Sequence, residues 1–239
     1  MPSQSANATN AVEHYRVVIA DDHPLFREAL VGRVQRAIPG VTIIEVADMA
    51  GVQEVLSDAG DIDLLLLDLN MPGAQGLSAL VHVRAIAPDV PVVVVSAMEE
   101  AAVVQRAVGL GAAGFIPKSS GLEQISAALR AVLAGQISVP ARFQGLLLEV
   151  SAAEANAAQR IGTLTAQQFR IAVLLAGGML NKQIGWHLEI TEATVKVHMS
   201  TILRKLGAQN RTQVALRMQV FDFDGSTGEA GIPDSVRRR

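Results

Sequence analysis

The sequence has 239 residues, of which 50% are hydrophobic, 18% charged and only 3% aromatic. This length allows two average domains with aliphatic cores. Because cysteine is absent, disulfide bonds, thiolate catalysis and cysteine metal sites are excluded. The polar start lacks the features of a secretory signal, and no apolar run approaches the roughly 18 residues of a membrane span. We therefore expect a soluble cytoplasmic protein that makes no membrane contact.

The formal net charge of −3 is unevenly distributed along the chain. Residues 1–145 carry 15 acidic and 9 basic side chains, whereas residues 146–239 carry 8 acidic and 11 basic ones. An acidic front and a basic back indicate different partners, and nucleic acid is a candidate for the basic part. Charge counts vary among ordinary domains, so this signal is weak when taken alone.

The first 130 residues alternate short β-branched runs with longer amphipathic segments. The pattern predicts strands at 16–20, 41–46, 63–68, 90–96 and 114–118, and helices near 25–37, 49–59, 76–87, 99–110 and 121–134. Five β-α pairs predict an α/β domain of the flavodoxin-like type, with a five-stranded parallel sheet covered by helices on both faces. The runs LLLL and VVVV fit strands that are buried on both sides.

The remaining sequence predicts a linker and a separate all-α domain. Four helical segments are expected there, at about 166–177, 181–188, 192–206 and 210–220. The predicted organisation is a disordered N-terminus at 1–14, the α/β domain at 15–134, a partly helical linker at 135–162, the helical domain at 163–221 and a flexible tail at 222–239.

Polar side chains follow the predicted strands of the first domain at the points where the strands end. Asp21 and Asp22 follow the first strand, Asp68 ends the third, Ser96 ends the fourth and Lys118 ends the fifth. Ligands of an open parallel sheet bind outside the carboxyl ends of its strands. Each residue alone could be a helix cap, a turn residue or solvated surface, but together they indicate one shared crevice.

This set of side chains suits phosphoryl transfer to a carboxylate. Clustered acids call for a hard divalent cation such as Mg²⁺. Asp68 could then attack phosphorus, while the metal and Lys118 share the charge of the phosphoryl oxygens and Ser96 bonds one of them. Because no phosphate-binding glycine fingerprint follows the first strand, we do not expect a bound nucleotide as the phosphoryl donor.

Residues 16–134 resemble a bacterial response-regulator receiver domain, and the matching stretches are VVIADDHPLFREAL, DLLLLDLNMPG, VVVVSA and GAAGFIPKSS. The resemblance implies that a sensor histidine kinase phosphorylates Asp68. It also implies that Asp21 or Asp22 binds Mg²⁺ together with Asp68 and the backbone carbonyl of Asn70.

By the same resemblance, Ser96 and Lys118 hold the phosphoryl group, and Phe115 changes rotamer together with Ser96. One departure is that Ser119 follows Lys118, where many receivers have proline.

The segment EATVKVHMSTILRKL, residues 192–206, has two distinct faces. Its apolar residues recur at helical spacing and predict one buried stripe: Val195, Met199, Ile202, Leu203 and Leu206. Val197, Ser200 and Arg204 lie on the opposite side with Lys196 on the flank, and Thr191 is the expected N-cap. A short preceding helix and a tight turn favour a helix-turn-helix, although an ordinary amphipathic helix with solvated charges would show the same pattern.

Residues 164–218 resemble the LuxR-type helix-turn-helix, so the whole chain is similar to the NarL/FixJ group of response regulators. The resemblance implies that Lys196, Val197 and Ser200 face DNA bases and that Lys182, Thr194 and Arg204 lie near phosphates. Two departures are LTAQQ in place of the common LTPRE, and Glu189 at a position where a small turn residue is usual.

The sequence is thus interpreted as a transcription regulator and not as an enzyme. Phosphorylation of Asp68 would switch DNA binding, with a homodimer as the active form and RNA polymerase as a further candidate partner. One alternative keeps the DNA-binding domain but makes the receiver a phosphorylation-independent interaction module. A second alternative is a phosphatase or a flavin protein on the same fold, which the missing flavin phosphate loop and the low aromatic content disfavour.

Overall fold

A computed structural model describes residues 14–58, 61–144, 152–219 and 221. The predicted flexible tail at 222–239 lies outside the described residues, as does nearly all of the predicted disordered N-terminus. No described helix has both the length and the apolar character needed to cross a bilayer.

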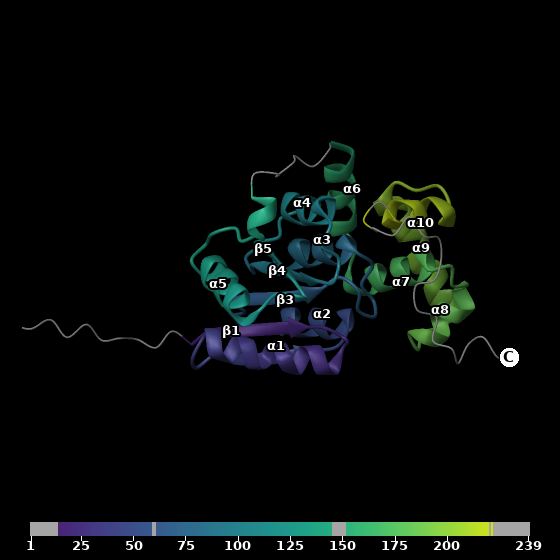
Figure 1. The fold of residues 1–239 in the computed structure, drawn as a ribbon. Helices are drawn as coiled ribbons and strands as arrows, with labels where there is room; N and C mark the ends of the chain where they lie inside the picture. The colour runs from purple at the N-terminus through teal and green to yellow at the C-terminus, as the bar shows by residue number, and fades with distance from the viewer. Residues whose placement is uncertain (1–13, 59–60, 145–151, 220, 222–239) are drawn as a thin grey trace, which may run out of the picture.

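The N-terminal domain is built on a five-stranded parallel sheet with the order β2-β1-β3-β4-β5 (Figure 1). The strands are β1 (Arg16–Ala20), β2 (Thr42–Val46), β3 (Leu64–Asp68), β4 (Val92–Ser96) and β5 (Gly114–Pro117). All side chains of β3, β4 and β5 are buried, because helices cover both faces of the sheet. The predicted fold is confirmed, and the strand ends differ from the expected ones by at most two residues.

The two faces of the sheet carry different helices and separate apolar clusters. The helices are α1 (Pro24–Ala37), α2 (Met49–Ser57), α3 (Leu77–Ile86), α4 (Ala101–Gly109) and α5 (Leu122–Leu133). Helices α1 and α5 cover one face, where Leu30 and Leu129 belong to the same apolar cluster as strand residues such as Ile19. The opposite face carries α2, α3 and α4, and its apolar cluster continues into the C-terminal domain.

The C-terminal part is all helical, as predicted. After a short 3-10 turn at Ala141–Phe143 come α6 (Ala152–Gly162), α7 (Ala166–Ala176), α8 (Asn181–His187), α9 (Glu192–Leu206) and α10 (Arg211–Gln219). Helix α6 lies inside the segment predicted as a partly helical linker. Phe169, Ile184, Val195, Ile202 and Met218 are fully buried and form the centre of this bundle.

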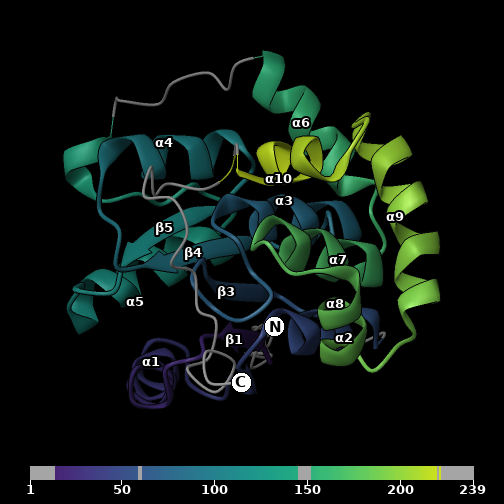
Figure 2. The same ribbon diagram turned by 90° about the vertical axis from the view of Figure 1, so that its right-hand side faces the viewer.

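The two domains pack directly on each other through α3 (Figure 2). All seven residues at 77–83 are buried, which a helix lying on a sheet achieves only when its outer side is covered too. Helix α6 packs along α3, and the ring of His82 stacks on the ring of Phe169 at a centroid distance of 4.2 Å. The N–H of Leu77 donates to the carbonyl of Phe221 over 2.9 Å. The sequence did not predict this packing.

Candidate functional site

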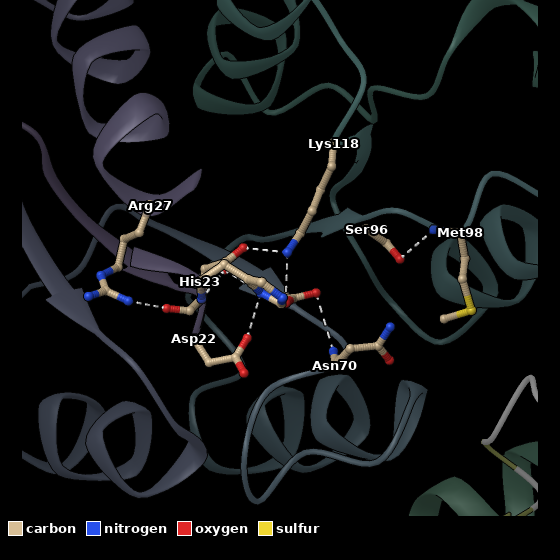
Figure 3. A network of polar contacts seen from close by, with 9 residues as sticks. Asp22, His23, Arg27, Asn70, Ser96, Met98 and Lys118 are labelled. Carbon is tan, nitrogen blue, oxygen red and sulfur yellow. Dashed lines mark hydrogen bonds and ion pairs between the residues drawn. The ribbon is translucent and has the colours of Figure 1, made fainter. Parts of the chain in front are cut away.

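The strand register places the polar residues of the first domain at one edge of the sheet. Ala20 pairs with Leu67, Asp68 with Val95 and Ser96 with Pro117, so the carboxyl ends of β1, β3, β4 and β5 are aligned. The backbone therefore brings together side chains that lie up to 97 positions apart in the sequence, namely Asp21, Asp22, Asp68, Ser96 and Lys118 (Figure 3).

Lys118 joins two of the acids at the centre of this site. Its Nζ lies 2.7 Å from Oδ2 of Asp21 and 2.9 Å from Oδ2 of Asp68. Both carboxylates are 1% exposed, and the lysine side chain is 16% exposed. The second oxygen of Asp68 accepts a hydrogen bond from the N–H of Asn70 over 3.2 Å. A buried ammonium between two buried carboxylates leaves net negative charge for a cation to neutralise.

The pKa values of the central pair reflect burial and ion pairing. Burial raises the pKa of Asp68 above its ordinary value, and the hydrogen bond and charge of Lys118 offset this only in part. Burial alone would lower the pKa of Lys118, but the hydrogen bonds and charges of Asp21 and Asp68 outweigh it, so that its pKa is raised. Lys118 therefore stays charged, and Asp68 is a more basic carboxylate than an exposed aspartate.

A divalent cation fits the acidic end of this site. Asp21, Asp22, His23 and Asp68 each offer one ligand atom, and these four atoms all lie within 4.8 Å of one another. His23 was not singled out by sequence reasoning. Its Nδ1 lies 2.8 Å from Oδ1 of Asp22 and 3.3 Å from Oδ1 of Asp21 (Figure 3). The carboxylates suit a hard cation with oxygen ligands.

Ser96 and Phe115 are both buried, Ser96 on β4 next to the strand of Asp68 and Phe115 on β5 one strand further out. The Oγ of Ser96 accepts a hydrogen bond from the N–H of Met98 over 3.1 Å, so in this state the hydroxyl serves the loop after β4 (Figure 3). The side chain of Phe115 is 2% exposed and already lies within the core. The Oγ of Ser119, which stands in the usual proline position, donates to Glu99 in the same loop.

The predicted DNA-facing residues of α9 lie on its exposed side. Val197 is 68% exposed, and Lys196 and Ser200 are exposed as well. The Nζ of Lys196 lies 2.7 Å from Oε1 of Glu192, one turn earlier on the same helix. This ion pair lowers the pKa of Glu192, and the positive charge of Lys182 on α8 adds to the effect. Lys182 therefore lies close enough to the start of α9 for its positive charge to act on Glu192.

The other two residues expected near phosphates have different surroundings. Arg204 is exposed near the end of α9. Thr194 is half-buried, and its N–H donates to the Oγ1 of Thr191 over 3.1 Å, which caps the helix as predicted.

The structure also accounts for the two departures in this domain. In LTAQQ, Gln168 accepts a hydrogen bond from the N–H of Thr165, and Thr165 accepts one from the N–H of Gln168, so the amide completes a capping box without an acid. Glu189 has φ +56 in the turn between α8 and α9, a left-handed conformation that favours glycine. The helix-turn-helix therefore contains a strained residue at its turn.

Sequence comparison identifies relatives of both parts of the chain. Residues 17–130 match the family described as the response regulator receiver domain, and residues 162–218 match bacterial regulatory proteins of the luxR family. The glycerol metabolism activator of Pseudomonas putida is 40% identical over 216 residues, which cover 87% of this chain and 97% of that protein. The nitrate/nitrite response regulator protein NarL of Escherichia coli (strain K12) is 32% identical over 201 residues, covering 84% of this chain and 93% of NarL.

Structural comparison finds a similar fold in the RcsB response regulator of Salmonella typhimurium. The TM-score is 0.52 at 21% sequence identity, and the match covers 87% of this chain and 98% of that one.

Proposed function

Because this chain belongs to the family of two-component response regulators that join a receiver domain to a LuxR-type DNA-binding domain, we propose that phosphorylation of Asp68 controls its binding to DNA. The family consists of transcription regulators and not of enzymes. The observation that carries the proposal is the placement of one lysine ammonium against the two buried carboxylates of Asp21 and Asp68.

In the proposed reaction, an oxygen of Asp68 attacks the phosphorus of a phosphohistidine on a sensor histidine kinase. The new P–O bond forms as the P–N bond breaks, and the electron pair of that bond leaves with the imidazole. Lys118 stabilises the charge on the phosphoryl oxygens during transfer. The raised pKa of Asp68 supports its role as a nucleophile, since a more basic carboxylate is the better donor of electrons.

We assign the cation site to Asp68, Asp21 and Asp22, with the backbone carbonyl of Asn70 as a further ligand. Bound Mg²⁺ would neutralise the clustered acids and polarise the phosphoryl group. The mutual closeness of the carboxylate oxygens supports this assignment.

Phosphorylation would then rearrange the site around a dianion. Lys118 would exchange one carboxylate partner for a phosphate oxygen, and the Oγ of Ser96 would leave the N–H of Met98 to bond another. Loss of that hydrogen bond releases the loop after β4, and Phe115 changes rotamer within the core. The change reaches the surface through the last strand and its flanking helices.

The DNA-binding part of the proposal places α9 in the major groove. Lys196, Val197 and Ser200 would contact bases, because their side chains are exposed on one side of that helix. The residues proposed to lie near phosphates are Lys182, Thr194 and Arg204. We assign the receiver to 15–134, the linker to 135–162 and the DNA-binding domain to 163–221, and we propose a homodimer that acts on DNA, and on RNA polymerase, in the cytoplasm.

A direct experiment tests the phosphorylation step. Incubation with a small phosphodonor and Mg²⁺ should add one phosphoryl group, detected by intact-mass spectrometry, and Asp68→Asn should abolish the addition. Asp89→Asn is the matched control, because Asp89 is an exposed aspartate just before the amino end of β4, at the edge of the sheet opposite the carboxyl ends of the strands. A phosphorylated Asp68→Asn variant would contradict the assignment, and an unmodified wild-type chain would favour the phosphorylation-independent module.

A further inference from the structure

On the receiver side, one face of α3 makes the contact between the domains. His82 and Ala85 lie one turn apart on α3 and form a stripe that faces the C-terminal part of the chain. His82 stacks on Phe169 of α7. A Cβ atom added at Gly162 of α6 would lie only 2.9 Å from the Cβ of Ala85, so small residues allow α3 and α6 to approach closely.

Two polar contacts hold the same arrangement outside this stripe. Arg106 on α4 and Glu154 on α6 form an ion pair of 2.8 Å, and each side chain is 25% exposed. The N–H of Leu77, the first residue of α3, donates to the carbonyl of Phe221, whose side chain is fully buried. The C-terminal part of the chain therefore docks through α6, α7 and Phe221, which follows α10.

Helix α9 is turned away from this contact. Its buried side, with Val195, Ile202 and Leu206, packs within the helical bundle, where α7 and α8 are its neighbours. Figure 2 shows α9 along the edge of the molecule, with α7 between it and the receiver's α3. Val197 is 68% exposed and the side chain of Lys196 is 63% exposed while the domains are docked.

We propose that the docked form of this chain binds DNA as it stands, without separation of the two domains. The proposed DNA-reading face of α9 is exposed in the same arrangement in which residues 77–83 of α3 are buried, so docking does not mask it. The step that phosphorylation controls would then be the pairing of two chains and not the uncovering of α9. This inference rests on the proposed DNA contacts of α9.

A disulfide that locks the domains together tests the proposal. The chain has no cysteine, so the double variant Ala85→Cys/Gly162→Cys contains only the two intended thiols. The 2.9 Å separation of their Cβ positions is below the about 3.8 Å of a disulfide, and a small shift of α6 accommodates the bond. The DNA probe is a dye-labelled duplex enriched from a random-sequence pool by the wild-type chain, and fluorescence anisotropy gives the affinity.

The oxidised and reduced forms of the double variant should bind this duplex with affinities within about threefold of each other. A larger loss on oxidation that reduction reverses would overturn the proposal. Failure of the disulfide to form in a folded variant would overturn it as well, because the docked arrangement would then not be adopted in solution. The single variant Gly162→Cys, treated in the same way, controls for oxidation itself.

Two further variants test the docked arrangement and the DNA contact separately. If the cysteine variant does not fold, His82→Glu is used to place a charge in the contact and open it, and an affinity gain above about threefold would show masking and overturn the proposal. Lys196→Ala in the reduced double variant tests the DNA contacts separately. If Lys196→Ala has no effect, the proposed DNA contact fails, whereas a loss confined to the oxidised form contradicts only the docked binding.

Discussion

Replacement of His82 by phenylalanine should make the docked protein more stable and less sensitive to acid. His82 is fully buried between α3 and α7, and neither ring nitrogen has a hydrogen-bond partner among the described residues. Burying such a polar group without a partner costs about 1–3 kcal/mol. A phenyl ring keeps the stack on Phe169 and removes both unsatisfied nitrogens, so His82→Phe should raise the free energy of unfolding at pH 7 by about 1 kcal/mol or more.

The pH dependence provides the sharper test. Burial lowers the pKa of His82 from 6.5 to about 4. A histidine with a depressed pKa is protonated first in the state that exposes it, so its contribution to stability is complete above pH 6.5 and is lost as the pH falls towards 4. Each pH unit in that window changes the free energy by about 1.4 kcal/mol, so lowering the pH from 7 to 5 should destabilise the wild-type chain by about 2 kcal/mol through this residue.

Charged residues on the helices that pack against His82 do not explain its lowered pKa. Helix α7 carries only Arg170 as a charged residue, and α6 carries only Glu154 and Arg160. Glu154 is paired with Arg106, and Arg160 donates to Asn156. The depressed pKa of His82 therefore follows from burial and not from a nearby cation.

Urea unfolding followed by circular dichroism at pH 7 and pH 5 would measure both effects. His187→Phe is the matched control, because it makes the same replacement at an exposed histidine on α8, outside the domain contact. The wild type, His82→Phe and His187→Phe have the same carboxylates, so the titration of these groups cancels when their changes in unfolding free energy between pH 7 and pH 5 are compared. If His82→Phe lost as much stability as the wild type between pH 7 and pH 5, the placement of His82 in a buried domain contact would be refuted.

Three further outcomes follow from the DNA-binding domain. Lys196→Ala should weaken binding to an enriched duplex, measured by anisotropy, because it removes a proposed base contact; an unchanged affinity would remove Lys196 from the interface. Glu192→Gln should tighten binding by about twofold, because it frees Lys196 from its ion pair on the helix and removes a negative charge beside DNA; weaker binding would show instead that Glu192 positions the lysine. Glu189→Gly should raise the midpoint of thermal unfolding, because it relieves a left-handed residue that costs about 1 kcal/mol, and an unchanged midpoint would show that the turn is not strained.

Most of the fold could be predicted because local pattern and burial agree. The leucines of β3 and the valines of β4 form continuous apolar runs, and such runs are typical of central strands of a parallel sheet that are buried on both faces. The site follows from the same rule, since parallel strands bring their carboxyl ends to one edge whatever the distance along the chain. The positions of Asp21, Asp68 and Lys118 at the ends of three predicted strands are therefore enough to predict that their side chains meet.

The domain contact could not be predicted in this way, because it depends on two surfaces with no sequence signal in common. On α3 the contact contains His82, which a helical pattern assigns to the polar side. On α7 the ring of Phe169 is apolar, as any core residue of the bundle would be. The spacing of Glu192 and Lys196, in contrast, was visible as an i,i+4 pair and could have been used.

The position of the contact connects the proposed phosphorylation site to the C-terminal part of the chain by a short route. Asp68 ends β3, and the loop that follows it leads directly into α3, the helix that carries the contact. Leu69 and Met71 in that loop are buried in the same apolar cluster as Phe169 and Phe221. Because a packed cluster shifts as a unit, the proposed rearrangement around Asp68 would change how the C-terminal domain sits on α3 even if α9 stays exposed throughout. In the proposed homodimer, the receiver would then set the relative orientation of the two DNA-binding domains, and this orientation must match the spacing of the two DNA half-sites.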